Sequence, residues 1–363
     1  MKLKLQCIIS KFLLILFIGC NTDRPASIHT SVTLSNVDDT LYVNKAHKIS
    51  GSNELLNPLY ILNVNDDYII ITEQLKNNFI KIFSIPNFDI SYSWGTFGRG
   101  PDEFMTFPTE IGTVNNQVYL FEIVSQKMRF YNVSDSGLIL SKDEELLFDG
   151  QVAPLNRIRR INEKLYFSDF GTDIGTDADE TNNEHIALQP NNENPIFTFG
   201  LYPETELTGY DRYATYFKTN WVKPNGESFV TTYISGENRI KIYDDNGQLK
   251  HSISIQDPTL EKDSLNKGDQ FLYRTTAWAS NEYIYFLGLY ESNEKIYYDN
   301  PDPSLRTSIE VWDWKGNLVH RNSFDRFIMN FTVSEKHGKI YGFSPLALDT
   351  IFEYNLSLEI KAN

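Results

Sequence analysis

The chain is poor in the residues that most often build metal and thiol chemistry, with 2 cysteines, 4 methionines and 6 histidines among 363 residues. The histidines are scattered, at positions 29, 47, 185, 251, 320 and 337. No His-Glu-x-x-His pair occurs, so a zinc enzyme is not expected. No Gly-x-Ser-x-Gly elbow occurs either, so nothing supports the serine mechanism of the hydrolase fold.

Basic residues are also few, since 33 lysines and arginines face 48 acidic residues and the formal net charge is −15. Nucleic-acid binding requires clustered lysine and arginine, so this balance argues against such a partner. The chain is instead rich in apolar and aromatic residues, with 41% hydrophobic residues, 21 tyrosines and 24 phenylalanines. This composition supports a large buried core and favours strands over helices.

Residues 1–19 have the features of a secretory signal peptide. Lys2 and Lys4 precede an apolar stretch at 12–18, which Gly19-Cys20 ends. The stretch is short for a bilayer span, which takes ~20 residues. A small residue before cysteine resembles the lipobox of bacterial lipoproteins. We expect lipidation at Cys20, a tether over 20–30 and a membrane-anchored location in the bacterial cell envelope, periplasmic or surface-exposed. An ordinary signal peptide and an uncleaved anchor are the alternatives.

A strand-like run of apolar and β-branched residues recurs six times, 47 to 64 positions apart, at 69–72, 118–121, 165–168, 229–232, 284–287 and 340–343. A cluster of turn-forming residues precedes each run, for example Asn115-Asn116 and Pro224-Asn225-Gly226. Second hairpins follow several runs. This spacing approaches the blade repeat of propellers and predicts an all-β, six-bladed β-propeller of four-stranded antiparallel blades.

The sixth repeat is too short to complete a blade before the chain ends. Strand candidates without a partner lie near the other end of the sequence, at 31–34 and 41–43. A propeller must close its ring to avoid open sheet edges. We therefore expect an N-terminal strand from 31–43 to pair into the last blade, and residues 31–363 to form a single domain.

A glycine-rich segment, Gly95-Thr-Phe-Gly-Arg-Gly-Pro-Asp-Glu-Phe104, follows the first repeat. It resembles the signature of TolB-like six-bladed β-propeller lipoproteins, an envelope family with little assigned biochemistry. The resemblance implies a lipoprotein with a binding or scaffolding role and supplies no reaction. The glycines also suit a chain crossing between blades. Arg99 and Glu103 are expected either to fasten this crossing as an ion pair or to contact a ligand at the propeller mouth.

Two further sets of side chains are candidate site residues. Glu73, Glu122 and Asp169 occupy the same register after the runs of repeats one to three. They would either hold Ca²⁺ near the axis or cap hairpin turns. Trp221 and Trp278 lie on the expected first strands of repeats four and five, where they would stack on a sugar, grip a peptide or pack between blades. A basic cluster, Arg157, Arg159 and Arg160, is interpreted as a salt-bridged blade edge.

The sequence therefore predicts a lipid-anchored propeller that binds protein or glycan in the envelope, with no catalysis evident and no cofactor required. The alternative is a calcium-dependent hydrolase or lyase of the lactonase type, which also uses six blades. That alternative depends on the three carboxylates meeting at an axial metal. A purely structural assembly component is the third possibility.

Overall fold

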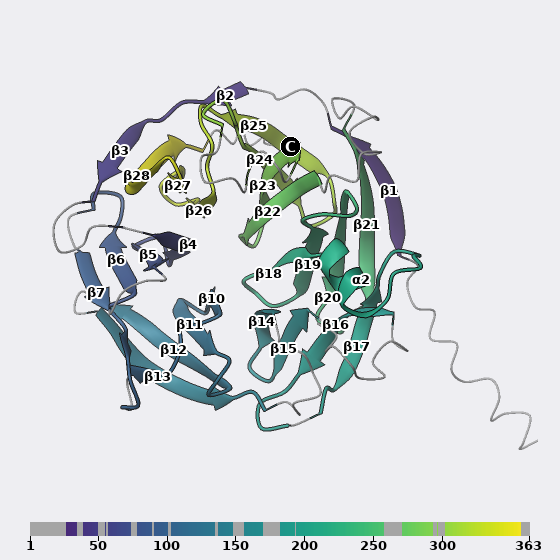
Figure 1. Cartoon of the computed structure of the whole chain (residues 1–363), viewed down its shortest axis with the longest axis horizontal. Helices are drawn as coiled ribbons and strands as arrows, with labels where there is room; N and C mark the ends of the chain where they lie inside the picture. Colours follow the sequence, from purple (N-terminus) through teal and green to yellow (C-terminus); the bar gives the residue numbers. More distant parts are fainter. Residues whose placement is uncertain are drawn as a thin grey trace, which may run out of the picture.

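The computed structural model describes residues 27–34, 39–49, 55, 57–73, 78–88, 91–100, 103–134, 137–147, 156–169, 182–192, 194–257, 271–292, 296 and 302–356. The signal peptide and Cys20 lie outside these residues. The described chain forms six blades arranged in a ring around a central channel (Figure 1). The prediction of a six-bladed all-β propeller is confirmed.

Each blade is an antiparallel sheet whose first strand lies innermost. From inside to outside, blade 1 contains β4 (Pro58–Val64), β5 (Tyr68–Glu73), β6 (Ile80–Ser84) and β7 (Ser91–Trp94), and blade 2 contains β10 (Glu110–Val114), β11 (Gln117–Glu122), β12 (Lys127–Ser134) and β13 (Gly137–Glu145). Blade 3 contains β14 (Asn156–Asn162), β15 (Leu165–Asp169), β16 (Asn183–Leu188) and β17 (Phe197–Leu201), and blade 4 contains β18 (Lys218–Val222), β19 (Ser228–Tyr233), β20 (Arg239–Asp244) and β21 (Leu249–Gln256). Blade 5 contains β22 (Phe271–Ala279), β23 (Tyr283–Ser292), β24 (Ser308–Asp313) and β25 (Leu318–Phe324), and blade 6 begins with β26 (Asn330–Ser334), β27 (Lys339–Ser344) and β28 (Ala347–Asn355).

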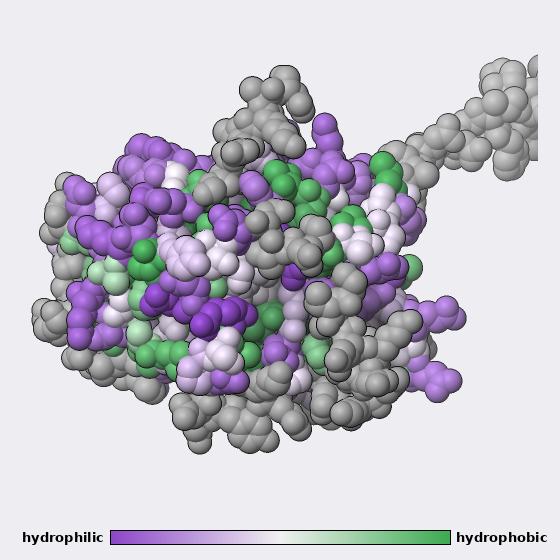
Figure 2. Space-filling model, turned by 90° about the horizontal axis from the view of Figure 1, so that it is seen from above, coloured by the Kyte–Doolittle hydropathy of each residue, from purple (hydrophilic) through white to green (hydrophobic). Residues whose placement is uncertain are grey.

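The hydrophobic core lies between neighbouring blades. Ile69, Ile70 and Ile71 are consecutive in β5, yet each is 0% exposed. Ile70 packs toward blade 2, while Ile69 and Ile71 pack toward blade 6. Because both faces of the sheet are covered, an unbroken apolar run replaces the alternation of a half-exposed strand. Side views show an outer surface of hydrophilic groups interspersed with apolar ones (Figure 2).

The N-terminal segment closes the ring, although with different residues than expected. β3 (Lys45–Lys48) pairs antiparallel with β28 and supplies the fourth strand of blade 6. β2 (Asp39–Leu41) and β1 (Ile28–Thr33) pair in parallel with β25 and β21, as fifth strands of blades 5 and 4 (Figure 1). The closing strand is thus 45–48 rather than 31–43, and β1 begins inside the expected tether. These parallel additions join distant segments, which no local pattern reveals.

A short pair of strands and a short helix lie between the blades. β8 (Thr96–Phe97) and β9 (Glu103–Phe104) form a short parallel pair after blade 1. The helix α2 (Gly209–Thr215) lies between blades 3 and 4. Within the described part of the chain, no helix has the length and hydropathy needed to cross a membrane.

Candidate functional site in the central channel

A cavity of ≈ 190 Å³ occupies the central channel, and every inner strand contributes to its wall. The aromatic lining residues are Tyr60, Trp221, Trp278 and Phe331, and the polar ones are Arg157, Arg159, Thr219, Thr275, Thr276 and Asn330. Ligand pockets for drug-sized molecules measure roughly 300–1,000 Å³. This cavity therefore suits a smaller group, such as one sugar ring or one side chain.

The two tryptophans singled out in the sequence meet in this cavity. Trp221 and Trp278 are half-buried, whereas Trp312 in the same blade as Trp278 is only 1% exposed and belongs to the core. The Arg159 guanidinium lies 4.5 Å from the Trp221 ring centroid. Trp278 packs at 5.4 Å against Tyr285 of the neighbouring strand. Each indole is therefore held in place while lining the channel.

The basic cluster of the sequence divides between two sides of β14. Arg159 Nη1 lies 3.3 Å from Glu110 Oε2, and its Nε donates to Asn220 Oδ1 at 3.1 Å. Arg160 lies 3.7 Å from Glu144 in blade 2. β14 is the inner edge strand of its sheet, so the interpretation as a salt-bridged blade edge holds for Arg159 and Arg160, and this edge also places Arg157 and Arg159 on the channel wall. The inner strand brings them to the axis, and no residue pattern distinguished this strand from an outer one.

A larger basin of ≈ 690 Å³ opens at the channel end where the inner hairpins turn. Its wall is rich in asparagine, with Asn63, Asn65, Asn115, Asn116, Asn225 and Asn281. Asn65, Asn115 and Asn116 have positive φ, so they are the turn-forming residues seen in the repeats. Trp278 lines both this basin and the channel cavity. The two spaces are therefore neighbours along the axis.

Behind the channel, blades 3 and 4 share a buried network of charges. Asp169 Oδ1 accepts from Asn220 Nδ2 at 3.0 Å and lies 3.1 Å from His185 Nδ1. Glu184 Oε1 accepts from Lys241 Nζ at 2.7 Å. Lys218 Nζ donates to Tyr202 Oη at 2.9 Å. The network thus reaches from the inner strand β18 outward to β20.

Burial alone would raise the pKa of Asp169 and of Glu184. For Asp169 the contact with His185 and the charge of Lys218 outweigh burial, so its pKa lies below the ordinary 3.8. For Glu184 the charges of Lys241 and Lys218 outweigh the effect of burial, so the pKa of this carboxyl lies below the ordinary 4.5. Burial lowers the pKa of His185. Both carboxylates are therefore ionised and the imidazole is neutral near pH 7.

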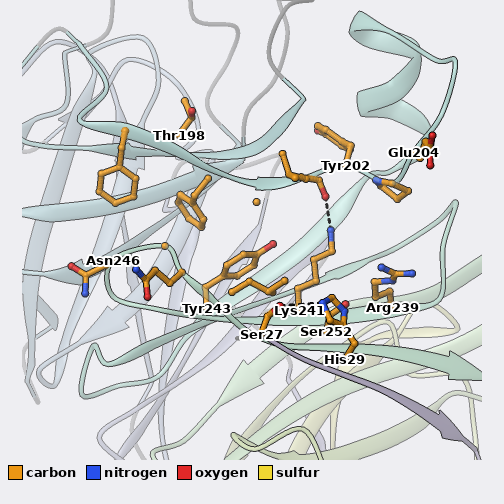
Figure 3. Close-up of a pocket in the computed structure, with 18 residues that line it drawn as sticks. Ser27, His29, Thr198, Tyr202, Glu204, Arg239, Lys241, Tyr243, Asn246 and Ser252 are labelled. Atoms are coloured by element: carbon orange, nitrogen blue, oxygen red, sulfur yellow. Dashed lines mark hydrogen bonds between the residues drawn. The ribbon is translucent and has the colours of Figure 1, made fainter. Parts of the chain in front are cut away.

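An outer pocket of ≈ 760 Å³ lies where this network reaches the surface between blades 3 and 4 (Figure 3). Lys241 points into it and donates to Leu201 O at 2.7 Å, and also to Glu184 and to Tyr233 Oη at 2.7 Å. A lysine has three donors, so all of them are occupied. This lysine serves the network, and the channel is the better candidate for ligand binding.

The three carboxylates expected near the axis bind local partners. Glu73 accepts from the Asn57 amide at 3.4 Å, Glu122 accepts from the Thr106 amide at 2.6 Å, and Asp169 belongs to the network above. Among the described residues, no three histidine, cysteine, aspartate or glutamate side chains are grouped so that they could hold a metal ion. The structure does not bring Glu73, Glu122 and Asp169 together.

The glycine-rich segment lies at the crossing from blade 1 to blade 2. Arg99 is exposed, and it forms no ion pair with Glu103 within the described segment 91–100 and 103–134. Glu103 Oε2 instead accepts from the Gly100 amide at 2.7 Å, while Arg129 Nη1 donates to Glu103 O at 2.8 Å. The expected Arg99–Glu103 ion pair is therefore wrong, because the carboxylate turns back into its own loop.

Comparisons with known proteins agree with this architecture. No family model matches the chain, and no curated protein matches it. A Bacteroides fragilis protein, provisionally assigned as exported, aligns over 91% of this chain and 99% of its own with 11% identity and a TM-score of 0.51. A Xanthomonas campestris gluconolactonase aligns over 89% of this chain and 99% of its own, with 7% identity and a TM-score of 0.48. Identities this low show the fold alone, so the class established is the six-bladed β-propeller.

Proposed function

We propose that the chain is a lipid-anchored binding protein of the bacterial cell envelope that takes a glycan in its central channel. The observation that carries this proposal is the position of Trp278, which lines both the asparagine-rich basin and the channel cavity. Sugar rings stack on indole faces, and their hydroxyls exchange hydrogen bonds with amide side chains. The basin and cavity offer both kinds of group side by side.

The anchoring part of the proposal rests on the sequence. The lipobox-like Gly19-Cys20 pair and the glycine-rich segment ending at Phe104 support a place among TolB-like propeller lipoproteins. Cys20→Ala is expected to move the protein from the membrane fraction to the soluble one and to abolish the mass added by lipid. A Cys20→Ala protein that stays lipidated or membrane-bound would contradict this assignment.

Glycan binding is tested with the detergent-solubilised full chain on a glycan array. We expect a defined subset of glycans to bind, and Trp278→Ala to weaken that binding at least tenfold. The matched control is Trp314→Ala, a half-buried tryptophan of the same blade that lines neither the cavity nor the basin and packs against the core between blades 4 and 5. Absence of glycan binding, or an equal effect of both variants, would overturn the proposal.

A further inference from the structure

Arg157 has an unusual backbone conformation for an arginine. Its φ is +56°, in the left-handed region that L-residues with a Cβ rarely adopt. The pairing of β14 with β15 is irregular between Asn156 and Arg159, so Arg157 occupies a bulge. Bulges redirect a side chain relative to its neighbours and recur beside functional sites. Here the bulge accompanies a side chain that lines the channel cavity.

The guanidinium of Arg157 is only partly used by the protein. Nη1 donates to Thr219 Oγ1 over a long 3.4 Å, and Nε is buried without a hydrogen-bond partner. Arg157 forms no ion pair with any residue that the structure describes. Arg159, two positions on, uses its Nε and Nη1 within blades 2 and 4. Nε of Arg157 is closed off from the channel, whereas Nη2 has no hydrogen-bond partner among the described residues, so the end of the guanidinium formed by Nη1 and Nη2 is the part that a ligand carboxylate can meet.

The surrounding charges favour an anion at this place. The carboxylates of the channel wall and the network behind it are Glu110, Asp169 and Glu184, and the cations are Arg157, Arg159, Arg212, Lys218 and Lys241. His185 is neutral, so two positive charges are left uncompensated. Each of the three carboxylates already interacts with groups of its own wall. The half-buried Arg157 guanidinium lies 5.1 Å from the Phe217 ring centroid but has no ion-pair partner, and a ligand carboxylate would supply one.

This inference rests on the proposed glycan-binding function and names the ligand class. We infer that Arg157 receives the carboxylate of an acidic sugar, whose ring lies in the channel cavity against the indoles of Trp221 and Trp278. Thr219 and Asn330 line the same cavity and offer a hydroxyl and an amide for the ring hydroxyls. The volume of ≈ 190 Å³ restricts the bound group to about one such residue.

The test compares methyl β-D-glucuronide with methyl β-D-glucoside, which differ by a carboxylate in place of a hydroxymethyl group. Titration calorimetry on the detergent-solubilised full chain is expected to give at least tenfold tighter binding of the glucuronide. A charge-assisted hydrogen bond supports a preference of this size. Arg157→Gln is expected to bring the affinities for the two sugars within twofold of each other. Arg306→Gln, an exposed arginine of blade 5, is the control that retains the preference.

A second variant separates loss of the side chain from loss of the fold. Arg157→Gly suits the positive φ, so it removes the guanidinium without backbone strain and must also lose the preference. Equal binding of both sugars by the wild-type chain would overturn this inference and leave glycan binding intact. Acetate binding as tightly as the glucuronide would overturn it as well, since the sugar ring would then contribute nothing. Failure of all glycans on the array would overturn the proposed function itself.

Discussion

Replacing Glu184 by glutamine should sharply destabilise the propeller, because it removes one charge from the network between blades 3 and 4. The Glu184 side chain is 0% exposed and that of Lys241 is 7% exposed, with 2.7 Å between Oε1 and Nζ. At an effective dielectric constant of about 20, two charges at this distance attract by roughly 6 kcal/mol before desolvation is counted. Breaking such a buried pair by removing one partner typically costs about 3–5 kcal/mol. We expect a loss in this range.

The assay is urea unfolding at pH 7, monitored by circular dichroism. The dependence of the unfolding free energy on urea concentration must be the same in all variants for their stabilities to be compared. Lys241→Met alone should cost a similar amount, because Glu184 then keeps its tyrosine partners, neutral His185 and the more distant Lys218, but no close cation. The double variant removes both charges, and its loss should be smaller than the sum of the single losses by about 2 kcal/mol or more. A loss below about 1 kcal/mol for Glu184→Gln, or strict additivity, would refute the reasoning.

The same network gives the stability a pH dependence of known sign. The folded pKa values of Asp169 and Glu184 lie below 3.8 and 4.5. The unfolded chain therefore binds protons more readily, so stability is fully present above about pH 4.5 and is lost as the pH falls through the folded values. His185, with its lowered pKa, adds a loss that begins below 6.5. Glu184→Gln should flatten the acid limb of a stability profile measured between pH 3 and pH 7.

Two further predictions concern the ring closure and the glycine-rich segment. Deleting residues 1–44 removes β1 and β2, the fifth strands of blades 4 and 5, and should lower the melting temperature modestly. Deleting residues 1–48 also removes β3 and should abolish cooperative melting, so equal melting of the two deletions would contradict the closure. Gly98→Ala places a Cβ onto the Glu103 carboxylate and displaces it from the Gly100 amide, so it should destabilise the crossing by about 1 kcal/mol without changing glycan affinity. Thermal melting and calorimetry measure the two effects, and weakened binding would move this segment to the ligand site.

Local patterns in the sequence predicted the repeated part of the fold. The hairpins follow from the recurring apolar and β-branched runs and from asparagines such as Asn115 and Asn116, whose left-handed backbone makes tight turns. The N-terminal pairings could not be predicted, because β1 and β2 join strands more than 200 residues away and have little buried surface of their own. Trp221 and Trp278 could be predicted as candidate site residues because their positions in repeats four and five place them on the first strand of a blade. Arg157 was noted only as part of the basic cluster and not as a channel residue, because a bulge changes which way a side chain faces and leaves no sequence signal.

The acidity of the chain does not oppose an acidic ligand in the channel. A net charge of −15 is a sum over the whole molecule, and exposed charges are largely screened beyond about 8 Å at physiological ionic strength. The potential in the channel is set by the groups close to it, where Arg157 and Arg159 line the cavity and Glu110 and Asp169 are the nearby carboxylates. The net charge therefore argues against binding to an extended polyanion such as nucleic acid, while the local balance of charge suits the single carboxylate that we propose at the axis.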